Sequence, residues 1–242
     1  MNRSKTTTAN QVVKLLKEQA DPEKAARFPN FFRSGPGEYG EGDQFLGVVA
    51  PKQHGIAKDC TDAPLIEIGK LLDHAIHECR QTALFILVLQ YQKAKDDPTR
   101  KQIYDFYVSK VDRVNNWDLV DSSCYKIMGP QLLDGSHQPL IRFAKANHLW
   151  KNRIAIVTTF YFIKRGYLRT TIDIAAILVN HRHNLIHKAV GWMLRELGQQ
   201  DEELLVQFLN EHSAVMPRTM LRYAIEKFPK SKRDRVLNGK KL

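Results

Sequence analysis

Apolar residues recur along most of this chain at intervals of three or four positions, which is the spacing of one face of an α-helix. The pattern is clearest in three long segments, 75–93, 149–164 and 184–197. The same spacing predicts eight shorter helices, over 11–19, 64–73, 100–113, 117–128, 139–146, 168–179, 201–210 and 217–227. A β-branched run at 154–159 continues into basic residues and Gly166, a typical helix end, and is therefore assigned to a helix. The pattern predicts an all-α protein.

Similar short segments recur among these helices. Segments that begin at His77, His148 and His183 can be laid over one another, and Met216 begins a further copy. The intervals are about 35 residues or twice that, which is typical of HEAT or armadillo solenoids. We therefore predict one domain over 1–242, a right-handed α-α superhelical solenoid of about six helical repeats. The second helix of each repeat begins with basic residues, and these are expected to lie along a concave face. The repeated histidines are expected to cap or pack.

Two segments depart from the helical pattern. A Gly-rich loop at about 33–44 carries Glu38, Glu41 and Asp43 and lacks the Lys-Ser/Thr ending of a phosphate-binding loop. It is predicted to be an ordered connector rather than a ligand site. The basic C-terminal tail at about 229–242 is predicted to be frayed and to add nonspecific attraction for phosphate.

Charge narrows the choice of partner. The chain has 37 Lys and Arg against 26 Asp and Glu, a formal net charge of +11, which favours nucleic acid over anionic lipid or a ribosomal surface. No apolar run is long enough to span a membrane, and the first residues lack the core of a signal peptide. The three cysteines lack metal spacing, so free thiols, no metal site and a cytoplasmic location are expected.

The segment around Trp117 carries the candidate chemistry. Asn115 and Asn116 are good helix N-caps, and Asp118 suits the positive end of the helix dipole. A helix that starts there places Trp117 and Asp121 on one face, at i and i+4, with Asp118 expected to lie away from that face. A carboxylate repels DNA phosphate, but a π surface beside a carboxylate suits a cation generated in DNA.

Four segments, 117–121, 150–153, 188–196 and 216–224, together resemble the AlkD family of alkylpurine DNA glycosylases, and the similarity extends over about residues 25–228. The resemblance implies HEAT-like repeats and a monofunctional hydrolase of the N-glycosidic bond. Its substrates would be cationic bases such as N3-methyladenine and N7-methylguanine in double-stranded DNA, removed without drawing the base into a protein pocket. It implies no cofactor, and we expect a monomer.

The resemblance also assigns roles to individual residues. Asp121 matches the family's catalytic aspartate, Trp117 and Trp192 match its site tryptophans, and Arg153 matches an arginine that contacts phosphate. The family's N-terminal site tyrosine falls near Phe31 or Phe32, which lack a hydroxyl, and Phe32 is the candidate for that place.

These groups suit glycosidic cleavage of a cationic base. Such a base leaves readily as a neutral molecule, and the oxocarbenium-like sugar left behind needs an anion nearby. The Asp121 carboxylate supplies it and can position or deprotonate water. Each tryptophan adds a cation–π contact worth about 0.5–2 kcal/mol, so the carboxylate is expected to dominate. About half of six basic residues are expected to touch DNA: Lys151, Arg153, Lys188, Arg195, Arg218 and Arg222.

Two other functions fit parts of the pattern. A non-catalytic HEAT-repeat DNA-binding protein would have the same basic surface as a glycosylase. Only Asp121 and the tryptophans distinguish the two functions. A solenoid adaptor for an acidic protein partner leaves the pairing of Trp117 with Asp121 unexplained.

Overall fold

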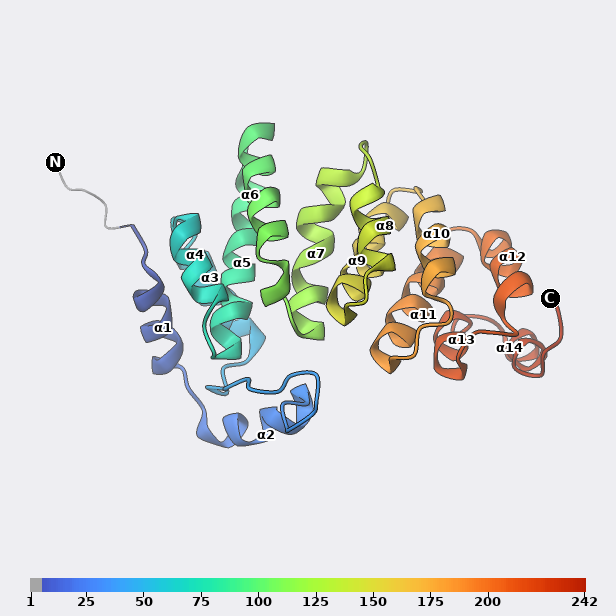
Figure 1. The fold of residues 1–242 in the computed structure, drawn as a ribbon, viewed down its shortest axis with the longest axis horizontal. Coiled ribbons are helices and arrows are strands. Elements are labelled where there is room, and N and C mark those ends of the chain that lie inside the picture. The colour runs from blue at the N-terminus through green and yellow to red at the C-terminus, as the bar shows by residue number, and fades with distance from the viewer. Residues whose placement is uncertain (1–5) are drawn as a thin grey trace. The chain divides into compact units, whose positions relative to one another are not determined.

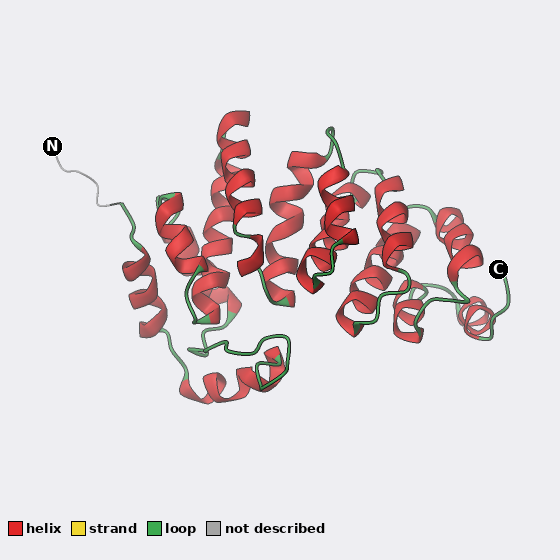
Figure 2. Ribbon diagram, in the orientation of Figure 1, coloured by secondary structure: helices red, strands yellow, loops and turns green. Residues whose placement is uncertain are grey.

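The computed structural model describes residues 6–242, and within that range the chain is helical with no strand (Figure 1). Only an isolated parallel bridge, between Gln44 and Ile76, is found among these residues, and Figure 2 shows helices joined by loops. The all-α class predicted from the sequence is confirmed. The chain forms two compact units: unit 1 ends at Ser123, and unit 2 covers Cys124–Leu242. The single domain predicted over 1–242 stays a prediction.

Unit 1 is built around one long central helix, α5. Its helices are α1 (Ala9–Glu18), α2 (Pro22–Phe32), α3 (Ala50–Asp59), α4 (Leu65–Leu72), α5 (His77–Lys93) and α6 (Asp97–Ser109), followed by the short 3₁₀ helix η1 (Val111–Arg113). Helix α7 (Trp117–Leu132) begins in unit 1 and continues into unit 2. Helix α5 packs against α1, α3, α4 and α6, and its Ile86 and Leu87 are fully buried. Figure 1 shows α2 lying crosswise at one end of α3 and α5.

Helix starts in unit 1 follow two different rules. Thr8, Asp21 and Asp96 cap α1, α2 and α6 by accepting hydrogen bonds from backbone N–H groups of the first turn. No side chain caps α5, and its first turn instead carries charged and polar side chains that are almost fully buried, among them His77 and Glu78. Buried polar groups need partners, so this turn organises the structure around it.

Unit 2 consists of helices that pack as neighbours along the chain. They are α8 (Gln138–Lys145), α9 (Leu149–Ile163), α10 (Arg169–Leu178), α11 (Asn184–Gly198), α12 (Glu202–His212), α13 (Arg218–Ala224) and α14 (Lys230–Leu237). Helix α9 contacts α8, α10 and α11, and α11 contacts α12 and α13. A Cβ on Gly191 would lie 2.5 Å from the Met220 carbonyl oxygen, so glycine permits the close approach of α11 and α13.

The repeated histidines divide into two kinds. His148 and His183 cap α9 and α11, where their Nδ1 atoms accept hydrogen bonds from the backbone N of Lys151 at 3.3 Å and of Leu185 at 3.1 Å. The predicted capping role is confirmed at these two positions. His77 has the packing role that was predicted as the alternative: it is 1% exposed and its ring lies 4.5 Å from that of Phe32, while its two nitrogens bind carboxylates.

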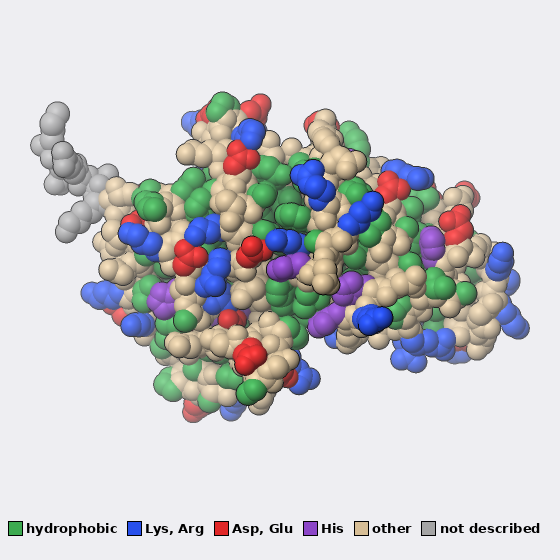
Figure 3. Space-filling model, in the orientation of Figure 1, with side chains coloured by type: hydrophobic (Ala, Val, Ile, Leu, Met, Phe, Trp, Pro, Cys, Tyr) green, Lys and Arg blue, Asp and Glu red, His purple; other side chains and the backbone are tan. Residues whose placement is uncertain are grey.

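Three helices lie where the sequence pattern predicts none: α2, α3 and α14. The tail expected to be frayed therefore contains a helix, and its basic side chains contribute to the blue surface over α13 and α14 in Figure 3. None of the described helices is long and apolar enough to cross a membrane.

Candidate functional site

The start of α7 is tied to the end of α2 by a buried asparagine. Asn116 Oδ1 accepts a hydrogen bond from the backbone N of Trp117 at 2.8 Å. Its amide Nδ2 donates to the carbonyl oxygen of Phe32 at 3.4 Å, and the residue has no exposed surface. The predicted helix start at Trp117 is confirmed, and the cap also anchors a second element.

Aromatic rings from α2 surround Trp117. Phe32 is stacked on the indole with a centroid distance of 5.8 Å and an angle of 21°. Phe31 meets the indole edge-on at 5.6 Å and leaves 61% of its surface exposed, whereas Phe32 is 8% exposed. Phe45 in turn stacks on the other side of this cluster, 5.3 Å from Phe32. The structure thus brings both candidate N-terminal aromatics against Trp117, and a role for Phe32 in binding stays a prediction.

A pocket of about 440 Å³ opens in unit 1 beside these rings. It lies between the end of α2, the start of α3, the first half of α5 and the start of α7. Its aromatic walls are Phe28, Phe31, Phe32, Phe85 and Trp117. Its acidic lining residues are Glu78, Asp118 and Asp121. An apolar concavity with a few polar groups is the usual form of a small-molecule site.

Asp121 lies one helical turn after Trp117, and both line this pocket. The predicted shared face is therefore confirmed. Asp121 is half-buried, so its carboxylate is partly shielded from bulk water. Electrostatic interactions of a shielded carboxylate are stronger than those of a carboxylate on an open surface. Its role as the catalytic residue stays a prediction.

Asp118 was expected to lie away from this face, and that expectation is wrong. It lines the same pocket as Asp121, because residues three apart in a helix are also neighbours. Asp118 is 8% exposed, and its Oδ2 accepts hydrogen bonds from His77 Nε2 and Gln81 Nε2, each at 2.8 Å. The other oxygen, Oδ1, is buried with no hydrogen-bond donor among the described residues.

His77 joins Asp118 to a second buried carboxylate. Its Nδ1 lies 2.9 Å from Asp43 Oδ2, and Arg80 donates to Asp43 Oδ1 at 2.6 Å. Burial alone would lower the pKa of His77, but the charge and hydrogen bonds of Asp118 and Asp43 raise it to about 9. Burial opposes ionisation of Asp43, yet His77 and Arg80 hold its pKa below the ordinary value. The four groups form a buried ionic chain from the Gly-rich loop to α7.

Glu78 fastens the segment that leads from this loop into α3. Its carboxylate accepts hydrogen bonds from the backbone N atoms of Leu46, Gly47 and Val48 at 2.8–3.2 Å. The Gly-rich loop is thus an ordered connector, as predicted, and its end is held by the first turn of α5. Asp43, counted in the sequence only as an argument against phosphate binding, makes a second attachment, to His77 and Arg80 of α5.

Two further predicted site residues belong to unit 2. Trp192 on α11 is half-buried and tilted against Phe160, with a centroid distance of 5.7 Å. Lys164 lies 5.0 Å from the Phe160 centroid and forms an ion pair with Glu196 at 2.9 Å. Arg153 is 6% exposed and donates to the Leu185 carbonyl oxygen at 2.6 Å. A phosphate contact by Arg153, and a single site that includes Trp192, stay predictions.

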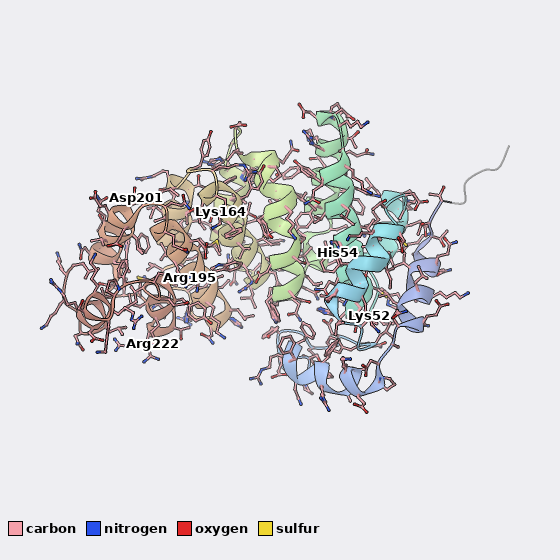
Figure 4. The ribbon with its side chains drawn as sticks, turned by 180° about the vertical axis from the view of Figure 1, so that it is seen from behind. Lys52, His54, Lys164, Arg195, Asp201 and Arg222 are labelled. Carbon is pink, nitrogen blue, oxygen red and sulfur yellow. The ribbon has the colours of Figure 1, made fainter. Side chains whose placement is uncertain are left out.

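The other basic candidates differ in their exposure and in their contacts within the protein. Arg195 is ion-paired with Glu226 and Glu196, and Arg218 donates to the Leu237 carbonyl oxygen at 2.6 Å. Arg222 is exposed, and Figure 4 shows it at the rim of unit 2. Lys151 and Lys188 are half-buried near the starts of α9 and α11. Their contacts with DNA stay predictions.

Sequence reasoning missed His77, Gln81 and Asp43 as parts of the site. His77 and Gln81 bind Asp118 from 41 and 37 residues away, and Asp43 binds His77 from 34 residues away, so no local pattern encodes these pairings. Cys60, Cys79 and Cys124 are free and buried, in agreement with the predicted free thiols. No group of three or more potential metal ligands is present in the part of the chain that the structure describes.

Comparisons with known proteins give a consistent result. A solved structure described as a predicted DNA alkylation repair enzyme from Enterococcus faecalis shares the fold, with a TM-score of 0.68. The two sequences are 18% identical, and the match covers 88% of this chain and 98% of the other. No curated protein matches the sequence. Residues 12–228 match the family model described as DNA alkylation repair enzyme. This match covers most of the chain, and the protein belongs to the DNA alkylation repair enzyme family.

Proposed function

We propose that the protein is a monofunctional DNA glycosylase that removes cationic N3- or N7-alkylated purines from duplex DNA. Membership of the family supports a role in the repair of alkylated DNA. The glycosylase chemistry rests on one observation: Trp117 and Asp121 lie one turn apart on α7 and line the same aromatic pocket. A carboxylate there has a use in cleavage that it lacks in simple DNA binding.

The reaction breaks the bond between C1′ of the sugar and the base nitrogen. Both bonding electrons leave with the base, which becomes neutral, and positive charge develops on the sugar. The Asp121 carboxylate stabilises that charge. A water oxygen then bonds to C1′ and loses a proton, for which Asp121 is the nearby base. No metal or cofactor is needed in this scheme, because the alkylated base is already a good leaving group.

Affinity for duplex DNA would come from basic side chains that contact phosphate without reading sequence. The net charge of +11 favours such binding, and Arg222 and Arg218 are exposed. Lys151, Arg153, Lys188 and Arg195 complete the proposed set. Recognition by phosphate contacts suits a protein that searches DNA for lesions, and we propose that it acts as a monomer.

Replacement of one carboxylate tests the mechanism. Asp121→Asn keeps the shape of the side chain and removes its charge, so excision of N7-methylguanine should fall about 10²–10³-fold. Binding to undamaged duplex should hold or tighten slightly, because repulsion of phosphate is lost. The measurement is single-turnover release of free base from alkylated duplex DNA.

Asp134→Asn is the matched control, since Asp134 is exposed just beyond the end of α7. It should excise at the wild-type rate. A wild-type rate for Asp121→Asn as well would remove Asp121 from the mechanism. If the wild-type protein binds DNA and releases no base, the non-catalytic DNA-binding function replaces the glycosylase.

A further inference from the structure

Positive charge is concentrated in the last helices of unit 2. Residues 218–242 contain nine Lys or Arg against two Asp or Glu, so this stretch carries a net +7 of the +11 of the whole chain. Figure 3 shows Lys and Arg side chains gathered over α13 and α14. The residues that line the pocket beside Trp117 all belong to unit 1. The concentration of charge is therefore a feature separate from the candidate site.

Packing does not explain the composition of α14. Among its eight residues only Val236 is buried, and four are Lys or Arg. A helix with so little apolar burial gains little from the core, and repulsion among its cations opposes its formation. A polyanion that neutralises these charges removes the repulsion. The sequence of α14 thus fits a helix whose exposed side meets an anionic ligand.

Neutral oxygens hold two guanidinium groups of α14 in place. Arg235 donates to the carbonyl oxygen of Lys241 at 2.7 Å, and Arg233 donates to that of Glu226 at 3.3 Å. A carbonyl oxygen positions a guanidinium without cancelling its charge. Because a guanidinium has several N–H donors, each arginine keeps donors for a phosphate.

Four cations of this stretch form no ion pair with any described residue. The two acids nearby are used elsewhere, since Glu226 pairs with Arg195 and Asp234 pairs with Lys230. The backbone N of residue 242 donates to Asn210 Oδ1 on α12 at 3.1 Å, which fastens the segment after α14. We call the four unpaired cations the α14 surface: Arg233, Arg235, Lys240 and Lys241.

The chemistry of this stretch favours nucleic acid over a membrane. Helices that bind a lipid surface carry an apolar face that enters the headgroup region. No large hydrophobic side chain is exposed within 218–242, all of which the structure describes. Duplex DNA carries about one negative charge per 1.7 Å of its axis, and basic side chains alone are enough to bind it.

We propose that the α14 surface is a second binding site for the phosphates of duplex DNA, separate from the site at Trp117 and indifferent to base damage. The inference rests on the proposed function only for the choice of DNA as the polyanion. None of its four members is among the six basic residues proposed above to contact DNA. Its side chains contact phosphates and read no bases, so it adds affinity during the search for a lesion.

Removal of the four charges tests this proposal in the intact protein. R233Q/R235Q/K240Q/K241Q should bind a short undamaged duplex at least about tenfold more weakly than the wild type. The slope of log affinity against log salt concentration should fall by about 2–3, because up to four phosphate contacts are lost. Fluorescence anisotropy over about 50–200 mM salt measures both. A duplex with N7-methylguanine should lose affinity by the same factor.

K14Q/K58Q/K93Q/K95Q is the charge-matched control. These four lysines are exposed in unit 1 and do not line the pocket beside Trp117. Both variants lower the net charge by four, so long-range attraction of DNA changes equally. The control should change the salt slope by less than about 1. Equal losses in both variants, or wild-type affinity in R233Q/R235Q/K240Q/K241Q, would overturn the proposal.

Two smaller changes keep the test independent of folding. The side chains of Lys240 and Lys241 make no hydrogen bond or ion pair with any described residue, so K240Q/K241Q should fold as the wild type does and lower the slope by about 1–2. Asp234→Asn removes an acid beside the α14 surface and should tighten binding. Weaker binding by this variant would contradict the assignment. Circular dichroism melts show whether each variant is folded.

Vesicles of phosphatidylglycerol test the other class of partner. If R233Q/R235Q/K240Q/K241Q keeps its affinity for DNA and loses affinity for vesicles, the surface binds a membrane and the proposal is wrong. Failure of this inference is distinct from failure of the glycosylase function. Release of free base by the wild type, together with full DNA affinity in the four-residue variant, would overturn the surface alone. Loss of affinity in that variant, together with no release of base by the wild type, would overturn the glycosylase alone.

Discussion

At the scale of single residues, the pocket depends on a positive charge held inside unit 1. The ring of His77 lies between the carboxylates of Asp43 and Asp118, and Arg80 is bound to the first of them. Two buried carboxylates so close together would repel each other without the imidazolium. Protonation of His77 is therefore coupled to folding. Its raised pKa of about 9 sets the pH above which the protonated ring no longer stabilises the fold.

Stability should fall at alkaline pH because of this one side chain. The pKa of His77 is about 9 when folded against an ordinary value of 6.5, so its contribution is complete below about pH 6.5 and is lost as the pH rises through about 9. The loss is on the order of 3 kcal/mol. Urea unfolding across this range should show the decline in the wild type and a flatter profile in His77→Gln.

His54→Gln is the control for that experiment, because His54 on α3 contacts the Phe85 ring on α5 rather than a pair of carboxylates. It should keep the wild-type pH profile. If His77→Gln loses stability with pH as steeply as the wild type, the coupling belongs to another group.

The sequence contained part of this site and lacked the rest for a physical reason. Trp117 and Asp121 were predictable because helical spacing alone places them on one face. The same rule, applied to residues three apart, would have placed Asp118 beside Asp121. The pairing of His77 with Asp43 and Asp118 depends on how three separate elements pack, and spacing along the chain carries no information about it.

At the scale of elements, the connection between α2 and α3 forms one wall of the pocket. Glu78 holds this connection by three backbone N–H groups, and Gly47 stands at its tightest point, with a φ of 82°. A Cβ at Gly47 would lie 2.1 Å from the carbonyl oxygen of Asp21. The packing of α2 against its own following loop therefore requires glycine here.

Gly47→Ala should destabilise the protein by more than about 2 kcal/mol, because it combines an unfavourable backbone angle with a clash against backbone atoms. Gly42→Ala is the matched control: Gly42 also has a positive φ, of 87°, but nothing lies within 4 Å of the added Cβ. It should cost only about 1 kcal/mol. Thermal unfolding of both variants measures the difference, and equal costs would show that the loop adapts to the added methyl group.

Prediction of elements succeeded where apolar spacing was sustained. Helices α5, α9 and α11 were predicted to within two residues at each end, because each buries a long apolar stripe. Helix α2 was missed although Asp21 and Pro22 form a typical start, since Pro29 interrupts it and only Phe32 is buried. Helix α14 has only one buried residue, Val236, so its sequence reads as a basic tail.

At the scale of the whole molecule, a basic chain contains an acidic pocket. The net charge of +11 favours polyanions, whereas the lining of the pocket favours cations. The two preferences are compatible in a protein that binds DNA through phosphates and selects a cationic base within it. Charge composition predicted the first preference. The second depends on which carboxylates are buried together, which composition does not record.

DNA binding should weaken steeply as salt concentration rises, because each phosphate contact releases condensed counterions. Arg222→Ala should weaken binding to all sequences equally and reduce the salt slope by about one contact, since Arg222 is exposed. Arg195→Ala should change the slope less, because Arg195 is held in ion pairs with Glu226 and Glu196. Fluorescence anisotropy at several salt concentrations checks both, and affinity that is indifferent to salt would rule out the phosphate contacts.

The buried ionic chain also orders events during synthesis. Asp43 and Glu78 belong to segments made early, but Asp118 emerges 41 residues after His77, its partner. Until the start of α7 has left the ribosome, His77 and Gln81 lack their hydrogen-bond acceptor, and Phe31 and Phe32 have no Trp117 to pack against. Contacts between distant segments form late in folding. We therefore expect the aromatic side chains of the nascent N-terminal helices to stay exposed until the short stretch 116–121 has been made and completes the pocket.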